Sequence, residues 1–342
     1  MAKNPNYSGN KDAFILLEDV CLLTRCGLLN KTPLIVDKNN QIIKETLDEQ
    51  LFWSRPMIHT YSGISSEERI ELINSRINNF QAYANNAPKK RQLVIPKEQQ
   101  AIYLCHSHGT YQFGHFHDSM QRLWNLPPSL LSSSKFVVSD TRKIKDFDLH
   151  LSALTEKEIT ESDLISTRLH DAIFFDRLVY PRCPVYPASY TPESIKWVRQ
   201  RYHNYFRESN AISDVKKVRL YLSRNHVRPG SRGVINEDSL LKTLVKDCNF
   251  IVLKGDEKLE TIIKLFRNAS VIVGPHGSLF ANTIYTNSDC KIIEWCPSNR
   301  IDYSFRNKPK LTKDYIHKLV PADKDFNIEV SDKMIDEIKL FL

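Results

Sequence analysis

The sequence predicts a two-domain α/β protein, and three observations carry that prediction. At 342 residues the chain is too long for one typical hydrophobic core and suits two ordinary domains. Beyond residue 218, strand-like and helical patterns alternate, as they do in a parallel sheet whose strands are joined by helices. Four prolines within residues 181–192 mark a linker, so we expect domains at 1–185 and 186–342.

Composition and charge exclude several classes of protein. With 41% hydrophobic and 26% charged residues, the chain is not expected to be disordered. It has no apolar run of the ~20 residues that a membrane helix needs and no signal-peptide pattern, so we expect a cytoplasmic protein without a transmembrane segment. Seven cysteines without C-x-x-C spacing argue against a disulfide framework or a zinc cluster. The net charge of +8 favours anionic partners, but no basic stripe indicates nucleic acid.

The first half alternates short strands with two helices. A turn at residues 38–40 predicts a hairpin, since Asn tolerates positive φ. A Ser-Ser-Glu-Glu start and apolar residues at helical spacing predict a helix over residues 65–83. A second helix is expected at residues 113–124, stopped by Pro127-Pro128. Strands are expected at residues 14–24, 33–36, 42–46, 101–105, 135–139 and 172–179.

The second half has a cleaner alternation, which predicts right-handed crossovers and a parallel sheet. A long helix opens it at Pro192, because proline is favoured in the first turn. Asn236 is the expected cap of the next helix. Strands are expected at residues 218–223, 250–253, 271–273 and 291–294, and helices at 192–206, 236–246, 258–268 and 278–285.

One strand-to-helix turn has the properties of an anion site. An apolar strand ends at Gly274-Pro275-His276-Gly277, and a helix begins at once. Strand carboxyl ends line the ligand crevice of open α/β sheets, and a helix N-terminus presents N–H groups to an anion. Gly277 allows a ligand to approach the backbone closely, and Ser278 adds a hydroxyl donor. His276 is expected at the mouth of the site, where it can donate a hydrogen bond to a phosphate. The alternative is a tight turn with a capping histidine, because the P-loop lysine and the dinucleotide fingerprint are absent.

Arg224 supports this site independently. It follows Ser223 at the end of a predicted strand, where a guanidinium can clamp a diphosphate with two parallel hydrogen bonds. Arg232 lies on the same loop, with an ion pair to Glu237 as an equally weighted alternative. Gly255 follows the next strand, where a nucleobase can lie against the backbone.

His115 and Asp118 are candidates for proton transfer in the first domain. They are three residues apart on one face of the predicted helix, and a histidine backed by a carboxylate can act as a general base. The alternative is a role in capping and in interaction with the helix dipole, which spacing alone favours. No H-E-x-x-H spacing occurs nearby, so we expect no metal site.

Taken together, these segments resemble the glycosyltransferase family 61 domain. That family pairs an aromatic-rich N-Y-F-H-x-x-x-D motif with a later I-S-R…R-x-I-x-N-E and a G-x-H-G-A-G-L-x-N motif. The corresponding stretches here are YQFGHFHD at 111–118, LSR at 222–224, RGVINE at 232–237 and GPHGSLFAN at 274–282. Gly114 and His117 depart from the first motif, and Ser278 stands where the family usually has alanine.

The resemblance implies a GT-B fold, with two Rossmann-like domains facing a cleft. The acceptor would bind to domain 1–185 and the nucleotide sugar to 186–342, with the option that the last helix packs back on the first domain. It implies inverting, metal-independent transfer (EC 2.4), without a cofactor, from a UDP-linked sugar such as UDP-xylose or UDP-N-acetylglucosamine to a hydroxyl of a glycan or glycoconjugate. His115 or Asp118 would be the base. The donor would contact Ser223, Arg224, Arg232, Gly255, Gly274, His276, Gly277, Ser278, Leu279 and Glu294.

Two parts of this assignment stay open. A ribose contact and a structural ion pair are almost equally weighted for Glu294. The alternative function is a non-catalytic sugar-nucleotide-binding or glycan-binding protein of the same fold. A further alternative is a polyanion-binding protein, which would show salt-sensitive binding without a nucleotide preference.

Overall fold

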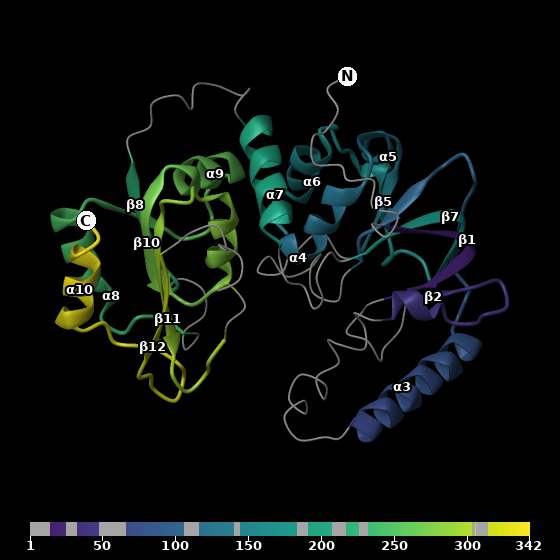
Figure 1. Ribbon diagram of the computed structural model, residues 1–342, viewed down its shortest axis with the longest axis horizontal. Coiled ribbons are helices and arrows are strands. Elements are labelled where there is room, and N and C mark those ends of the chain that lie inside the picture. Colours follow the sequence, from purple (N-terminus) through teal and green to yellow (C-terminus); the bar gives the residue numbers. More distant parts are fainter. Residues whose placement is uncertain are drawn as a thin grey trace. The chain divides into compact units, whose positions relative to one another are not determined.

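The fold consists of two units, Met1–Ser189 and Tyr190–Leu342, each of which is described by itself (Figure 1). The computed structural model describes residues 14–24, 33–47, 66–105, 116–139, 144–182, 191–206, 217–225, 232–302, 305 and 314–342. None of the helices in these ranges is long and apolar enough to span a membrane.

The first unit is built on a mixed sheet. Its longest strands, β1 (Phe14–Leu23) and β7 (Ala172–Pro181), pair antiparallel along their full length. The order is β2-β1-β7-β4-β5-β6, and β3 pairs with β7 outside this path. The pairings of β7 with β3 and β4, and those of β5 with β4 and β6, are parallel. The other strands are β2 (Leu34–Val36), β3 (Gln92–Ile95), β4 (Ala101–Tyr103), β5 (Lys135–Val138) and β6 (Leu164–Ser166).

Helices of the first unit bury apolar residues against this sheet. Phe80 and Ala84 of α3 pack in a cluster with β2 and the end of β1. The helices are α3 (Ser66–Asn86), α4 (Phe116–Met120), α5 (Pro128–Ser133) and α6 (Phe147–Thr155), with 3-10 turns η1 (Lys44–Thr46), η3 (Gln121–Asn125) and η5 (Glu161–Asp163).

Two predicted elements of this unit differ from the structure. The strand expected at 42–46 is wrong, because only Ile42 bridges to Val36 and the chain then enters η1. The Thr46 hydroxyl donates to the Ile43 carbonyl at 2.7 Å, a local bond that competes with strand pairing. The helix expected at 113–124 is α4 followed by the tighter η3, and residues 113–115 lie outside the described ranges.

The second unit contains a five-stranded, wholly parallel sheet in the order β12-β11-β10-β8-β9. The first strand of the unit, β8, lies between the second and the third. The chain adds β9 on one side of β8 and then β10, β11 and β12 on the other, so the strand order switches between β8 and β10. In doubly wound folds the ligand crevice lies at such a switch point. The strands are β8 (Val218–Leu222), β9 (Phe250–Leu253), β10 (Ala269–Pro275), β11 (Lys291–Pro297) and β12 (Tyr315–Val320).

Helices cover both faces of this sheet, with α8 and α10 on one face and α9 on the other (Figure 1). Met334 and Ile338 of α10 are buried in a cluster with Tyr221 and Trp295, so the last helix packs on the sheet of the second unit. The helices are α7 (Pro192–Tyr205), α8 (Glu237–Leu241), a π-helical turn η6 (Lys242–Asp247), α9 (Leu259–Arg267), the 3-10 helix η7 (Ser278–Tyr285) and α10 (Asp332–Lys339).

Asn236 is the N-cap of α8, as predicted, but its side chain makes no capping hydrogen bond to that helix. Its amide instead clamps the segment before α10, donating to the Val330 carbonyl at 2.8 Å and accepting from the Val330 N–H at 3.0 Å. The observed fold confirms the predicted α/β class, with parallel strands in both units.

Candidate functional site

A cavity of about 160 Å³ opens where β8, β9 and β10 end. It therefore lies at the switch point of the parallel sheet, where such folds bind ligands. Pockets for whole small-molecule ligands measure roughly 300–1,000 Å³, so this cavity suits one portion of a ligand, such as a diphosphate. Its lining consists of Leu222, Ser223, Arg224, Lys254, Pro275, Gly277, Ser278 and Leu279.

Arg224 rests against the backbone of Gly277. A Cβ atom placed on Gly277 would lie 2.0 Å from Nη1 of Arg224 and 2.9 Å from its Cδ. Because Gly277 has an extended φ of 178°, which any residue can adopt, the need for glycine is one of space. We call Gly274-Pro275-His276-Gly277 the glycine turn. It places the Arg224 guanidinium beside the start of η7, where the first N–H groups of a helix lack partners within that helix.

Three arginines gather at this edge of the sheet. Burial first, and then the charges of Arg232 and Arg300, lower the pKa of Arg224 to about 10. Burial and Arg300 also lower the pKa of Arg232, while Asp302 opposes that change. Like charges that lie close together repel one another, and a bound anion would relieve that repulsion. Such a cluster beside a cavity is a candidate functional site.

Among the described residues, Arg232 does not form the ion pair with Glu237 that was the alternative prediction. Glu237 instead accepts a hydrogen bond from the Tyr221 hydroxyl at 2.8 Å, within the interior of the second unit. Arg232 has a left-handed backbone with φ of 63°, and its charge acts on Arg224. Its position therefore favours the anion site over the ion pair.

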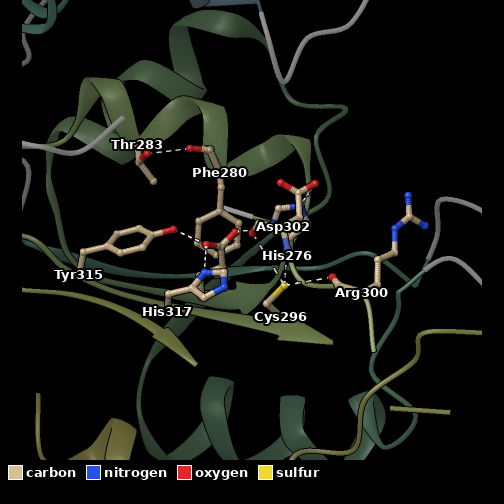
Figure 2. Close-up of polar contacts among 9 residues, drawn as sticks. His276, Phe280, Thr283, Cys296, Arg300, Asp302, Tyr315 and His317 are labelled. Carbon is tan, nitrogen blue, oxygen red and sulfur yellow. Dashed lines mark hydrogen bonds and ion pairs between the residues drawn. The ribbon is translucent and has the colours of Figure 1, made fainter. Parts of the chain in front are cut away.

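The buried carboxylate of Glu294 contacts His276 of the glycine turn. Strand register aligns Gly274 with Glu294 and Glu294 with His317, so the three residues form a row across β10, β11 and β12. Glu294 is fully buried, and its Oε1 lies 2.7 Å from Nδ1 of His276. Its Oε2 lies 2.9 Å from Nδ1 of His317 and accepts from the Tyr315 hydroxyl (Figure 2). Three partners offset the large free-energy cost of burying a charge.

His276 lies between two carboxylates. Only 2% of the residue is exposed, and its Nε2 lies 3.3 Å from Oδ2 of Asp302, on the side away from Glu294 (Figure 2). Burial acts to lower the pKa of His276, but the hydrogen bonds to Asp302 and Glu294 outweigh burial and raise it. Burial acts to raise the pKa of Glu294, and its bonds to His276 and His317 outweigh that effect and lower it.

These contacts bear on the roles predicted for His276 and Glu294 as ligand-binding groups. Both ring nitrogens of His276 face carboxylates, so in this conformation His276 positions the turn rather than presenting a donor at the mouth. Both oxygens of Glu294 have internal partners. A ribose contact by Glu294 would therefore require one of these bonds to open.

Two further predicted glycines shape the cavity without lining it. A Cβ on Gly274 would lie 2.6 Å from the backbone oxygen of Leu222, so glycine permits the close approach of β10 to β8. Gly255 has a φ of +89°, and its N–H donates to Oε2 of Glu257 at 2.8 Å. A Cβ there would lie 2.9 Å from Leu279, which places Gly255 at the rim.

The predicted base candidates are only partly described. Asp118 belongs to α4, but its side chain lies outside the described structure, and so does all of His115. Their neighbour His117 is fully buried, with its ring 6.2 Å from that of His150. Burial lowers the pKa of His150 to about 3, so this second histidine is neutral near pH 7.

Sequence reasoning missed several residues around the site. Lys254 lines the cavity directly after β9, and the rule that placed Arg224 at a strand end would have found it. Arg300 and Asp302 follow β11, which was predicted to end at residue 294 but continues to Pro297. His317 lies on a strand that was not predicted. Among the described residues, no group of three or more His, Cys, Asp or Glu side chains is arranged to hold a metal ion.

The fold and the site define a doubly wound α/β protein with an arginine-lined cavity, a candidate anion site, at the switch point of its parallel sheet. Residues 113–293, more than half of the chain, match the family model described as Glycosyltransferase 61. The chain therefore belongs to the glycosyltransferase 61 family, which confirms the predicted resemblance and makes the protein a glycosyltransferase by family.

Comparison with solved structures gives weaker similarities. E. coli heptosyltransferase WaaC with ADP is 13% identical, with a TM-score of 0.35. The same enzyme with ADP-2-deoxy-2-fluoro heptose is 12% identical, with a TM-score of 0.34. Each comparison covers 71% of this chain and 98% of the other. No protein with a curated description matches the sequence.

Proposed function

We propose that the protein is an inverting, metal-independent glycosyltransferase that uses a nucleotide diphosphate sugar. The donor would be UDP-linked, for example UDP-xylose or UDP-N-acetylglucosamine, and the acceptor a hydroxyl of a glycan or glycoconjugate. The observation that carries this proposal is the seating of Arg224 on Gly277 beside a cavity at the sheet's switch point. A guanidinium can bind two phosphate oxygens at once in that position.

The proposed role of the arginines is to stabilise the departing diphosphate. When the bond between the anomeric carbon and the diphosphate oxygen breaks, both electrons stay with that oxygen, and negative charge develops on it. Arg224 lines the cavity, and the charge of Arg232 is close enough to lower the pKa of Arg224, so both would need little reorganisation when this charge appears. Their charges would do what a divalent cation does in other sugar transferases.

The proposed acceptor step takes place on the opposite face of the sugar. The acceptor oxygen forms a bond to the anomeric carbon as the diphosphate leaves, which inverts the configuration at that carbon. The acceptor proton passes to Asp118 or His115, acting as general base in the first unit. Neither a metal nor another cofactor is part of this sequence of steps.

Two variants test the proposal by separating donor binding from turnover. Arg224→Ala is expected to weaken UDP binding and to lower transfer, because the phosphate contact is lost. Asp118→Asn is expected to retain UDP binding and to lose transfer, because the proton acceptor is lost. Lys339→Ala, on the surface of α10, is the control. Wild-type turnover by both site variants would refute the proposal, and UDP binding without transfer to any acceptor would favour a sugar-nucleotide-binding protein.

A further inference from the structure

Arg300 lies at the same edge of the sheet as the cavity, although no motif in the sequence points to it. Strand order places β11 beside β10, and β10 beside β8. Because these strands are parallel, their carboxyl ends lie at one edge, and residues that follow them come close together. Arg224 follows β8, the glycine turn follows β10, and Arg300 follows β11.

The backbone that carries Arg300 is held by hydrogen bonds. We call residues 297–302 the Arg300 loop. The N–H of Arg300 donates to the Pro297 carbonyl at 3.0 Å and closes a turn. The N–H of Asp302 donates to Sγ of the buried Cys296 at 3.4 Å (Figure 2). The loop is therefore shaped before any ligand binds, which reduces the conformational entropy lost on binding.

The Arg300 side chain has a defined position as well. Its guanidinium carbon lies 5.2 Å from the centre of the Phe326 ring, in a cation–π contact. Its charge adds to burial in lowering the pKa of both Arg224 and Arg232. The other charged group of the loop, Asp302, faces Nε2 of His276.

The number of positive charges indicates the kind of anion that fits. A diphosphate within a nucleotide sugar carries two ionised phosphates, and the released nucleoside diphosphate carries a further charge. Arg224 lies against the glycine turn, where one phosphate can bind it. Arg300 follows β11, the strand next to β10. We therefore expect it to reach a second phosphate while the first stays on Arg224. A single phosphate would need only the first of these contacts.

We propose that Arg300 is a specificity-determining residue whose guanidinium binds the second phosphate, so that the site prefers a diphosphate to a single phosphate. This inference rests on the proposed function and deepens it by assigning the two phosphates to different strand ends. A role limited to packing against Phe326 would affect both anions equally. The ratio of the two affinities therefore separates the two roles.

The test measures binding of inorganic pyrophosphate and inorganic phosphate by titration calorimetry. Arg300→Ala is expected to weaken pyrophosphate binding about ten- to a hundredfold, the value of a charged hydrogen bond, and to change phosphate binding less than about threefold. Arg300→Lys is expected to be intermediate, because the charge remains and the planar fork is lost. Arg201→Ala is the matched control, since Arg201 makes the same kind of contact with Trp197, at 5.5 Å, on α7.

The outcomes distinguish this inference from the proposed function. An unchanged ratio of the two affinities in Arg300→Ala, or wild-type protein that binds no pyrophosphate, overturns the inference. If the ratio falls as expected but no nucleotide sugar is bound or used, the assignment of Arg300 stands and the proposed function fails. If transfer occurs and the ratio is unchanged, only the assignment of Arg300 fails.

Discussion

Replacing Gly277 with alanine is expected to displace Arg224 and to leave the rest of the site intact. The new Cβ would lie 2.0 Å from Nη1, whereas ordinary contact begins at 3.4 Å, so the guanidinium has to move by about 1.4 Å, the difference between these distances. Charge-assisted hydrogen bonds are only ~2.7–2.9 Å long, so this shift breaks the contact with a phosphate. Losing this hydrogen bond costs about 1.5–3 kcal/mol of binding free energy, which corresponds to roughly 10- to 150-fold weaker UDP binding.

The free energy of unfolding is expected to change little in the same variant. Alanine adopts the extended backbone of Gly277, and the displaced atoms belong to a flexible side chain, so the change stays within about 0.5 kcal/mol. Gly274→Ala is the contrasting control, because its Cβ would meet the Leu222 backbone oxygen at 2.6 Å in a buried strand. Overpacking there costs about 1–3 kcal/mol. Calorimetric UDP titration and thermal denaturation measure both quantities, and wild-type UDP affinity in folded Gly277→Ala protein would refute the reasoning.

Three further predictions concern the buried pair His276 and Glu294, the proposed base Asp118, and the hydrogen bonds from Asn236 to the segment before α10. The raised pKa of His276 stabilises the fold fully below about pH 6.5, and this contribution declines as the pH rises through the folded-state value. The lowered pKa of Glu294 contributes above about pH 4.5 and is lost as the pH falls through its folded-state value. Glu294→Gln should therefore lower the melting temperature most between these limits, and a pH-independent difference would contradict the assigned charges. Asp118→Asn should cut kcat at least about a hundredfold with unchanged UDP affinity, since general-base catalysis contributes ~10²–10⁴-fold; a normal kcat would exclude Asp118 as the base. Asn236→Ala should lower the free energy of unfolding by about 1–3 kcal/mol in urea titrations, because both bonds to Val330 are lost, and an unchanged midpoint would show that the clamp contributes nothing.

The strands of the second unit were predictable because they are short apolar runs between polar or glycine-containing segments. The strand Tyr315–Val320 was not predicted, since an edge strand needs fewer apolar residues and this one contains His317 and Lys318. The order of the strands also had to come from the structure. Pairing of β8 with β10 depends on contacts between residues far apart in the sequence, which local patterns do not encode.

The candidate site was partly predictable for a similar reason. Arg224, Gly277 and Ser278 directly follow predicted strands, so the carboxyl-end rule placed them together, and all three line the cavity. The environment of His276 depends on Glu294 and on residues of the loop after β11. Those contacts follow from strand register and loop conformation, so spacing along the chain did not indicate that His276 would be buried.

A crystal structure of the protein with UDP tests the central claim most directly. We predict that the diphosphate lies in the cavity at the ends of β8 and β10, with phosphate oxygens within about 3 Å of the Arg224 guanidinium. UDP bound at another edge of the sheet, or bound in the cavity with no phosphate contact to Arg224, would contradict the account.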